Sequence, residues 1–233
     1  MARLILFPVP IGSEDPNTSL PPYNREMLNT CHIFIVENIR TARRHLKLMG
    51  YNAPIDDITF FELNEHTSPF ETIHYLDPIA QGDNVGLMSE AGIPCVADPG
   101  NIITTMAQRN GIEILPLVGP SSIMLALMAS GFNGQNFAFN GYPPIDDKSR
   151  VALLRTLEQR IHRDNQTQIF IEAPYRNDKL LHFFASHLQP ITRICVASDL
   201  TLPTQFVRSR LARQWLTDPP QLHKHPTIFL LYK

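Results

Sequence analysis

Residues 85–100 have the sequence VGLMSEAGIPCVADPG, in which a short apolar run passes into a loop rich in Gly, Ala and Pro. The run at 85–88 predicts a buried strand, and the pattern at 100–110 predicts a helix after the loop. Ligands of open α/β sheets tend to bind at the carboxyl ends of the strands. The loop between this strand and this helix is therefore the first candidate for a binding site.

The same alternation of strand and helix continues on both sides of this stretch. Short apolar runs predict further strands at 4–7, 33–36, 58–62 and 112–115. Helical patterns predict helices at 40–49 and at about 69–80. Strand–helix alternation of this kind predicts an α/β layer with a mainly parallel sheet.

The second half of the chain has a different pattern of strands and helices, which begins after a predicted domain boundary at residues 117–120. We expect helices at about 121–130 and 149–161, with a strand near Phe137. Further strands are predicted at 168–171, 191–197, 205–208 and 227–232. Because fewer helices separate these last runs, a mixed or antiparallel sheet is expected there. The predicted domains are 1–118 and 119–233.

Composition restricts the class of protein. Of the 233 residues, 43% are hydrophobic and 18% charged, which is typical of a globular chain and not of a disordered one. The formal net charge of −2 excludes a basic field over the whole chain and leaves a local basic patch open. The N-terminal apolar run is too short for a signal peptide, and no stretch approaches a membrane span. We therefore expect a cytoplasmic protein without a membrane segment.

Cysteine and histidine give no sign of a metal site. Cys31, Cys95 and Cys195 lie far apart in the sequence, a pattern that is typical of reduced thiols in a cytosolic protein. The nine histidines lack the spacing of a metal-binding motif, so no metal is expected.

The loop at 89–100 has two interpretations. Small residues at Ser89, Ala91 and Gly92 let backbone amides approach a ligand, and the prolines stiffen the loop. Gly and Pro also punctuate ordinary connections, and Asp98 has the position of a helix N-cap. The spacing is neither G-x-G-x-x-G nor a P-loop, so it gives no support to a dinucleotide or a nucleoside triphosphate.

The loop resembles the Ser-Asp-Ala-Gly-Thr-Pro…Asp-Pro-Gly motif of the ribosomal RNA 2′-O-ribose methyltransferases, a branch of the tetrapyrrole-methylase superfamily. Other segments resemble motifs of that family in the same order: Pro-Ile-Gly at 10–12, Glu-Asn-Ile-Arg at 37–40, Pro-Leu-Val-Gly-Pro-Ser at 116–121, Phe-Asn-Gly-Tyr-Pro-Pro at 139–144 and Ile-Glu-Ala-Pro-Tyr-Arg at 171–176. The resemblance therefore covers nearly the whole chain.

This resemblance implies a two-domain tetrapyrrole-methylase-like α/β fold, a homodimer, and S-adenosylmethionine bound in the cleft between the domains. The first sheet is expected to be mainly parallel and the second mixed. Carried over position by position, the resemblance assigns cofactor contacts to Ile11, Ser89, Glu90, Ala91, Gly92, Ile93, Pro94, Val96, Ser121, Ser122, Glu172, Pro226 and Thr227.

The family motifs expected to face the substrate are less well kept than those around the cofactor. Asn38 and Ile39 replace an Asp and a Thr, both histidines of a His-x-His-Asn-Glu motif are missing at 61–65, and an Arg and a Lys are missing at 198–202. Within these motifs, the residues that could orient a ribose hydroxyl and help to remove its proton are Glu37, Arg40, Asn64 and Glu65. A surface ion pair or a helix cap is the alternative role for each.

The acceptor is left open by the sequence. Arg40, Arg43, Arg44 and Lys47 share one face of a predicted helix, where they could contact the phosphates of ribosomal RNA in the small subunit or simply be solvated. The family resemblance favours ribose methylation. The missing basic residues favour a small acceptor such as a tetrapyrrole precursor. A cofactor-binding protein without catalysis is the third possibility.

Overall fold

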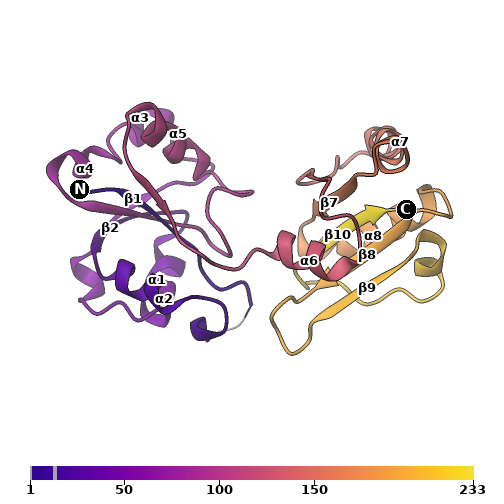
Figure 1. Ribbon diagram of the computed structural model, residues 1–233, viewed down its shortest axis with the longest axis horizontal. Coiled ribbons are helices and arrows are strands. Elements are labelled where there is room, and N and C mark those ends of the chain that lie inside the picture. The colour runs from indigo at the N-terminus through magenta and orange to yellow at the C-terminus, as the bar shows by residue number, and fades with distance from the viewer. Residues whose placement is uncertain (1, 13–14) are drawn as a thin grey trace. The chain divides into compact units, whose positions relative to one another are not determined.

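The computed structural model describes residues 2–12 and 15–233, which form two compact units that divide between Ser121 and Ser122 (Figure 1). The boundary predicted after residue 118 lies slightly earlier. Each unit is built on its own sheet and has its own buried side chains.

The described residues of the first unit form a five-stranded sheet with the strand order β3-β2-β4-β1-β5. All neighbouring pairs in it are parallel. Its strands are β1 (Leu4–Phe7), β2 (Cys31–Val36), β3 (Thr59–Glu62), β4 (Asn84–Met88) and β5 (Ile114–Pro116). The connecting helices are α1 (Pro22–Leu28), α2 (Ile39–Leu48), α3 (Pro69–Thr72), α4 (Asp77–Gln81) and α5 (Asn101–Arg109), with 3-10 turns at Pro16–Thr18 and Ile55–Asp57.

Helices cover both faces of this sheet, α1 and α2 on one side and α3 and α5 on the other (Figure 1). Alternate strand residues therefore enter different cores. Ile5 and Phe34 pack with the side chains of α1 and α2, whereas Leu4 and Ile35 pack with those of α4 and α5. Burial of both faces explains why the strands have continuous apolar sequences.

Gly119 lies where the chain leaves this sheet, and its lack of a side chain is a packing requirement. A Cβ atom here would overlap the ring of Pro8. Because that ring is rigid, the backbone itself must move to admit a methyl group. We expect Gly119→Ala to lower the free energy of unfolding by about 1–3 kcal/mol.

Urea unfolding followed by circular dichroism measures this change. Gly134→Ala is the control, because a Cβ at Gly134 meets no atom within 4 Å. Equal stability of the Gly119 variant and the wild type would show that Pro8 and its neighbours yield freely.

The second unit has a mixed sheet with the strand order β6-β7-β10-β8-β9. Strands β6 and β7 are parallel, and the other neighbouring pairs are antiparallel. The strands are β6 (Phe137–Phe139), β7 (Thr167–Ile171), β8 (Arg193–Ser198), β9 (Phe206–Leu211) and β10 (Thr227–Tyr232). The helices are α6 (Ser122–Ser130), α7 (Asp147–Asp164) and α8 (Asn177–His187), with 3-10 segments at Pro174–Arg176 and Ala212–Leu216. The α/β class, the parallel first sheet and the mixed second sheet are thus confirmed.

Three helices differ from the sequence prediction. The helix expected at about 69–80 is two short helices, α3 and α4, and Pro78 lies in the first turn of the second, where its missing N–H costs nothing. Neither α1 nor α8 was predicted. Helix α8 buries Leu180, Leu181 and Phe184 in the core of the second unit, so its apolar pattern is that of a helix packed on a sheet.

Candidate functional site

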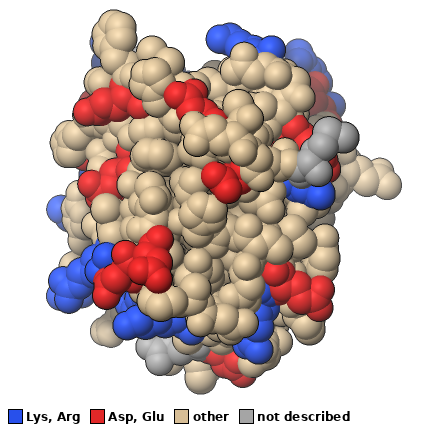
Figure 2. All heavy atoms as spheres, turned by 90° about the vertical axis from the view of Figure 1, so that its left-hand side faces the viewer, with Lys and Arg blue, Asp and Glu red and all other residues tan. Residues whose placement is uncertain are grey.

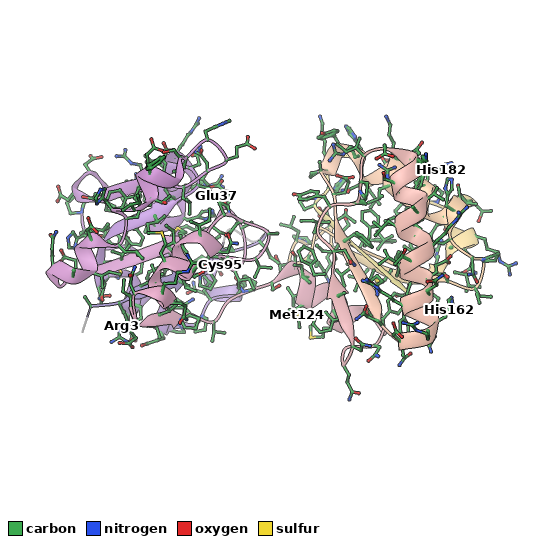
Figure 3. All side chains as sticks on the ribbon, turned by 90° about the horizontal axis from the view of Figure 1, so that it is seen from above. Arg3, Glu37, Cys95, Met124, His162 and His182 are labelled. Atoms are coloured by element: carbon green, nitrogen blue, oxygen red, sulfur yellow. The ribbon has the colours of Figure 1, made fainter. Side chains whose placement is uncertain are left out.

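The carboxyl ends of the first sheet bring several predicted site residues to one edge. Because the strands are parallel, the residues that follow β2, β3 and β4 all emerge there, and they include Glu37 and Ser89. Figure 3 shows Glu37 and Cys95 toward one end of this unit and Arg3, which precedes β1, toward the other. This is the edge at which open α/β sheets bind ligands.

The loop at 89–94 is fastened to the segment after β1. Gly92 and Val9 exchange two backbone hydrogen bonds, of 3.1 and 2.9 Å. Gly92 has a φ of +74°, and a Cβ on it would lie 3.1 Å from Ile11 Cγ2 and 3.2 Å from the carbonyl oxygen of Pro120. Both the conformation and the close packing thus require glycine. The Ser89 hydroxyl donates to the carbonyl oxygen of Ala91 over 3.1 Å within the loop.

A hollow of about 480 Å³ opens between this loop, the segment after β1 and helix α2. It is lined by Pro10, Ile11, Gly12, Arg44, His45, Leu48, Glu90 and Ala91. Three of the predicted cofactor-binding residues, Ile11, Glu90 and Ala91, therefore meet at one concave surface. Its lining combines apolar side chains with the polar groups of Arg44, His45 and Glu90, as ligand sites usually do.

The remainder of the loop turns back toward the sheet. Ile93 is half-buried, Pro94 is buried and Val96 is 42% exposed. The Asp98 carboxylate accepts from the backbone N–H groups of Cys95 at 2.9 Å and Gly100 at 2.7 Å. Asp98 is therefore not the N-cap of α5, which is Gly100. Its role is to hold a turn in which Cys95 has a φ of +69°.

Glu37 lies beside this turn. It lines a small internal space together with Leu63, Pro94 and Asp98. Burial, and then the negative charges of Asp98 and Glu90, raise the pKa of Glu37 to about 7. Burial also raises the pKa of Asp98, against the two backbone hydrogen bonds that it accepts. A carboxylate that titrates near neutral pH is suited to accept a proton from a substrate hydroxyl.

Helix α2 begins directly after Asn38. The Asn38 side chain caps it by accepting from the Thr41 N–H over 3.1 Å. The basic residues of the helix line an open hollow of about 610 Å³ along its outer face: Arg40, Arg43, Arg44 and Lys47, with Ile39. Arg43 also pairs with Asp56 at 3.6 Å and lies over the Phe60 ring.

Asn64 and Glu65 follow β3, and their described contacts lie within the loop that contains them. The Asn64 side-chain oxygen accepts from the His66 N–H over 2.9 Å. Glu65 pairs with the His66 ring at 3.6 Å, and both side chains are exposed. Leu63, which precedes Asn64, lies beside Glu37 in the small internal space, but among the described contacts none joins Asn64 or Glu65 to Glu37.

In the second unit, Glu172, Pro226 and Thr227 lie at one edge of the mixed sheet. Glu172 follows β7, and its side chain is buried in an ion pair with Arg176, 2.6 Å away. The Thr227 hydroxyl lies 2.9 Å from the carbonyl oxygen of His225 and 3.0 Å from Ser198 Oγ. Pro226 is exposed. Ser122 opens α6, and Ser121 is the last residue of the first unit.

Sequence reasoning missed two further features. His45 reaches from α2 to the 89–94 loop, where its Nε2 atom lies 3.1 Å from the carbonyl oxygen of Glu90. In the second unit, the buried Asp199 carboxylate contacts His225 Nδ1 at 2.7 Å and accepts from the Thr204 hydroxyl at 2.9 Å. No sequence motif joins these residues, because each site combines segments that are separated in the chain.

Curated bacterial proteins with the name ribosomal RNA small subunit methyltransferase I resemble this chain over most of its length. The protein from Vibrio cholerae is 25% identical over 98% of this chain and 76% of its own. Those from Escherichia coli O157:H7 and Synechocystis are 28% and 29% identical, over 85% and 91% of this chain and 65% and 72% of their own. No protein-family profile matches the chain. The chain is a methyltransferase related to these enzymes.

The fold of this methyltransferase is also that of a solved structure. The crystal structure of the methyltransferase CobJ superimposes with a TM-score of 0.64 at 17% identity, over 100% of this chain and 95% of that one. The methyltransferase thus has the two-sheet α/β fold of that enzyme. Among residues 2–12 and 15–233, no helix is long and apolar enough to cross a membrane. Nor do the described histidine, cysteine and acidic side chains gather in a group of three that could hold a metal.

Proposed function

We propose that this protein uses S-adenosylmethionine to methylate the 2′-hydroxyl of a ribose in small-subunit ribosomal RNA. Methyltransferases of the two kinds that it resembles use this methyl donor. The single observation that carries the proposal is the loop at 89–94, fastened at the carboxyl edge of the first sheet and bordering a hollow beside Ile11.

The residues present fit this cofactor. The cofactor supplies a sulfonium whose methyl group is already activated for transfer, so the protein has to bind, align and exclude water. In the first unit, we assign these tasks to Ile11, the loop at 89–94, Val96 and Ser121. In the second unit, Ser122, Glu172, Pro226 and Thr227 remain predicted contacts, and for Glu172 the ion pair with Arg176 leaves one carboxylate oxygen to offer.

Glu37 is the proton acceptor in this proposal. The bound cofactor would supply the methyl group to the ribose oxygen, with its thioether as the leaving group. The hydroxyl proton passes to the Glu37 carboxylate and then to solvent. The pKa of about 7 makes this carboxylate a better base than an exposed one while it remains ionised in a large share of molecules at neutral pH.

The basic face of α2 is the part of the first unit that suits a phosphate backbone. On the face drawn in Figure 2, Lys and Arg are interspersed with Asp and Glu instead of forming a broad basic field. In contrast, Arg40, Arg43 and Lys47 line a common hollow on α2, whose N-cap Asn38 directly follows Glu37. We propose that this face places RNA phosphates near the reacting edge.

Replacing Arg40, Arg43 and Lys47 together with alanine tests this role. We expect RNA affinity to fall, and the slope of log affinity against log salt to flatten by about one unit for each phosphate that the variant no longer neutralises. Arg44 is kept, because it also lines the hollow with Glu90 and its replacement would disturb cofactor binding. Filter binding with small-subunit RNA over a salt series measures the slope.

The control is Arg109→Ala with Lys179→Ala, which removes exposed charges from α5 and α8. If the triple variant binds RNA with the wild-type slope, the α2 face does not contact phosphates.

A second candidate is a methyltransferase that acts on a tetrapyrrole precursor. The Arg and the Lys that are missing at 198–202 favour it, because a small acceptor has no phosphate backbone to contact. The side chains of Asn64 and Glu65 contact the neighbouring His66. This also fits a site in which the motifs that would face RNA are missing.

Transfer of labelled methyl from S-adenosylmethionine to three acceptors separates the candidates: small ribosomal subunits, free small-subunit RNA and tetrapyrrole precursors. The proposal predicts label in the RNA of one of the first two. Label in a tetrapyrrole alone supports the second candidate, and cofactor binding without transfer to any acceptor supports a non-catalytic protein.

Homodimer formation and a cytoplasmic location belong to the proposal through family resemblance.

A further inference from the structure

His45 has an unusual position on helix α2. Its neighbour Arg44 and the basic residues around it are exposed, whereas His45 is only 6% exposed and points into the unit. It lines the hollow that Ile11 and Ala91 also border. A buried histidine at this point brings a polar group from α2 to the wall of the proposed cofactor site.

The hydrogen bond of His45 fixes which ring nitrogen carries the proton. Nε2 lies 3.1 Å from the carbonyl oxygen of Glu90, and a carbonyl oxygen can only accept, so Nε2 donates. Nδ1 is buried and has no hydrogen-bond partner among the described residues. Burial lowers the pKa of His45, and the charge of Arg44 acts in the same direction against the Glu90 carbonyl. The ring is therefore neutral, with its hydrogen on Nε2.

The carbonyl group of Glu90, which accepts this hydrogen bond, lies in the loop at 89–94 beside the hollow. Glu90 lies between Ser89, which follows β4, and Ala91, which lines the hollow. Two residues further, Gly92 is held by the backbone of Val9. The loop is thus anchored on the β1 side through its backbone and on the α2 side through the His45 ring, so the amides between the two anchors have a set orientation.

We propose that His45 is a positioning residue, which holds the carbonyl group of Glu90 and thereby orients the backbone at 89–91 toward the cofactor. This inference rests on the proposed function, because it takes the hollow beside Ala91 as the cofactor site. His45 does not contact reacting atoms in this account. It acts through the loop and links that loop to the helix that carries the basic face.

The pair His45→Gln and His45→Met separates the hydrogen bond from simple filling of space. Glutamine can place an N–H group near the position of Nε2, whereas methionine has a similar length and no donor. We expect the methionine variant to bind S-adenosylhomocysteine about three- to tenfold more weakly, as the removal of one neutral hydrogen bond predicts, and glutamine to restore most of the affinity. Calorimetry on the full chain measures both.

The kinetic readout is specific to positioning. In the methionine variant, KM for the cofactor should rise while kcat at saturating cofactor stays near that of the wild type. Small-subunit RNA should bind both variants as it binds the wild type, because the outer face of α2 is unchanged. Methionine and glutamine variants that both bind the cofactor as tightly as the wild type overturn the inference. Equal weakening of both also overturns it, because the ring and not its donor would then matter.

Nitrogen NMR of the wild-type imidazole ring keeps the inference testable if the methionine variant does not fold. The expected result at neutral pH is a neutral ring protonated on Nε2, whose Nε2 signal shifts when S-adenosylhomocysteine is added. Protonation on Nδ1, or a ring signal that does not respond to bound ligand, contradicts the inference. Failure of the wild type to bind S-adenosylhomocysteine at all is a different result and refutes the proposed function itself.

Discussion

Replacing Glu37 with glutamine is expected to lower the rate of methyl transfer by about 10²–10⁴-fold while cofactor affinity changes little. The amide keeps the size of the side chain and one accepting oxygen, and it removes the ability to accept a proton. Because Asp98 and Glu90 lie near enough to raise the pKa of Glu37, the neutral amide also relieves repulsion, so folding should not suffer. Initial rates at pH 8 with saturating cofactor measure the effect.

The dependence on pH gives the same prediction a second form. Glu37 accepts a proton only when ionised, so kcat/KM of the wild type should rise with pH through about 7 and level off above it. The glutamine variant should lack this rise. Glu26→Gln, which changes an exposed carboxylate on α1, is the control. A Glu37→Gln variant that retains the wild-type rate and pH profile would show that another group removes the proton.

Ala91→Phe is expected to weaken cofactor binding on the order of 100-fold, which corresponds to ~2.7 kcal/mol. Ala91 is exposed and lines the hollow, so a phenyl ring there fills the proposed site without entering the core. Calorimetry with S-adenosylhomocysteine measures the decrease in affinity. Ala53→Phe adds the same ring at an exposed position away from this hollow and should bind the ligand normally.

This substitution is more informative than Gly92→Val, which would also weaken binding. Gly92 has a φ of +74° and packs against Ile11 and Pro120, so a valine there distorts the loop whether or not a ligand binds. Undiminished affinity of Ala91→Phe would exclude the hollow beside the 89–94 loop as the cofactor site.

The sheets were largely predictable because their strands are buried on both faces or alternate regularly. The runs at 4–7 and 227–232 match β1 and β10 in full, and the predicted strand at 33–36 lies within β2. The helices were harder. In α8 the apolar residues Leu180, Leu181 and Phe184 have helical spacing, but the helix follows the turn at Pro174 after few residues and was not predicted.

The candidate site shows where sequence reasoning ends. Glu37 could be chosen from its place after a strand, but its proton affinity depends on Asp98 and Glu90, which lie far along the chain. Asp98 could be placed before a helix, yet the turn that it holds could not be predicted from its position alone. Arg44 is expected from the sequence on a basic helix face, and the structure shows that it also borders the hollow with Glu90. Each of these depends on the folded path of the chain, which spacing alone does not encode.

The most direct measurement of the central claim is a crystal structure of the protein with S-adenosylhomocysteine. The account predicts the ligand at the carboxyl edge of the first sheet, with its amino-acid part against the backbone at 89–94 and with Ile11 beside it. The Glu37 carboxylate should lie near the side of the sulfur atom that carries the methyl group in S-adenosylmethionine. A ligand bound at the amino edge near Arg3, or on the second unit without contact to the 89–94 loop, would contradict the account.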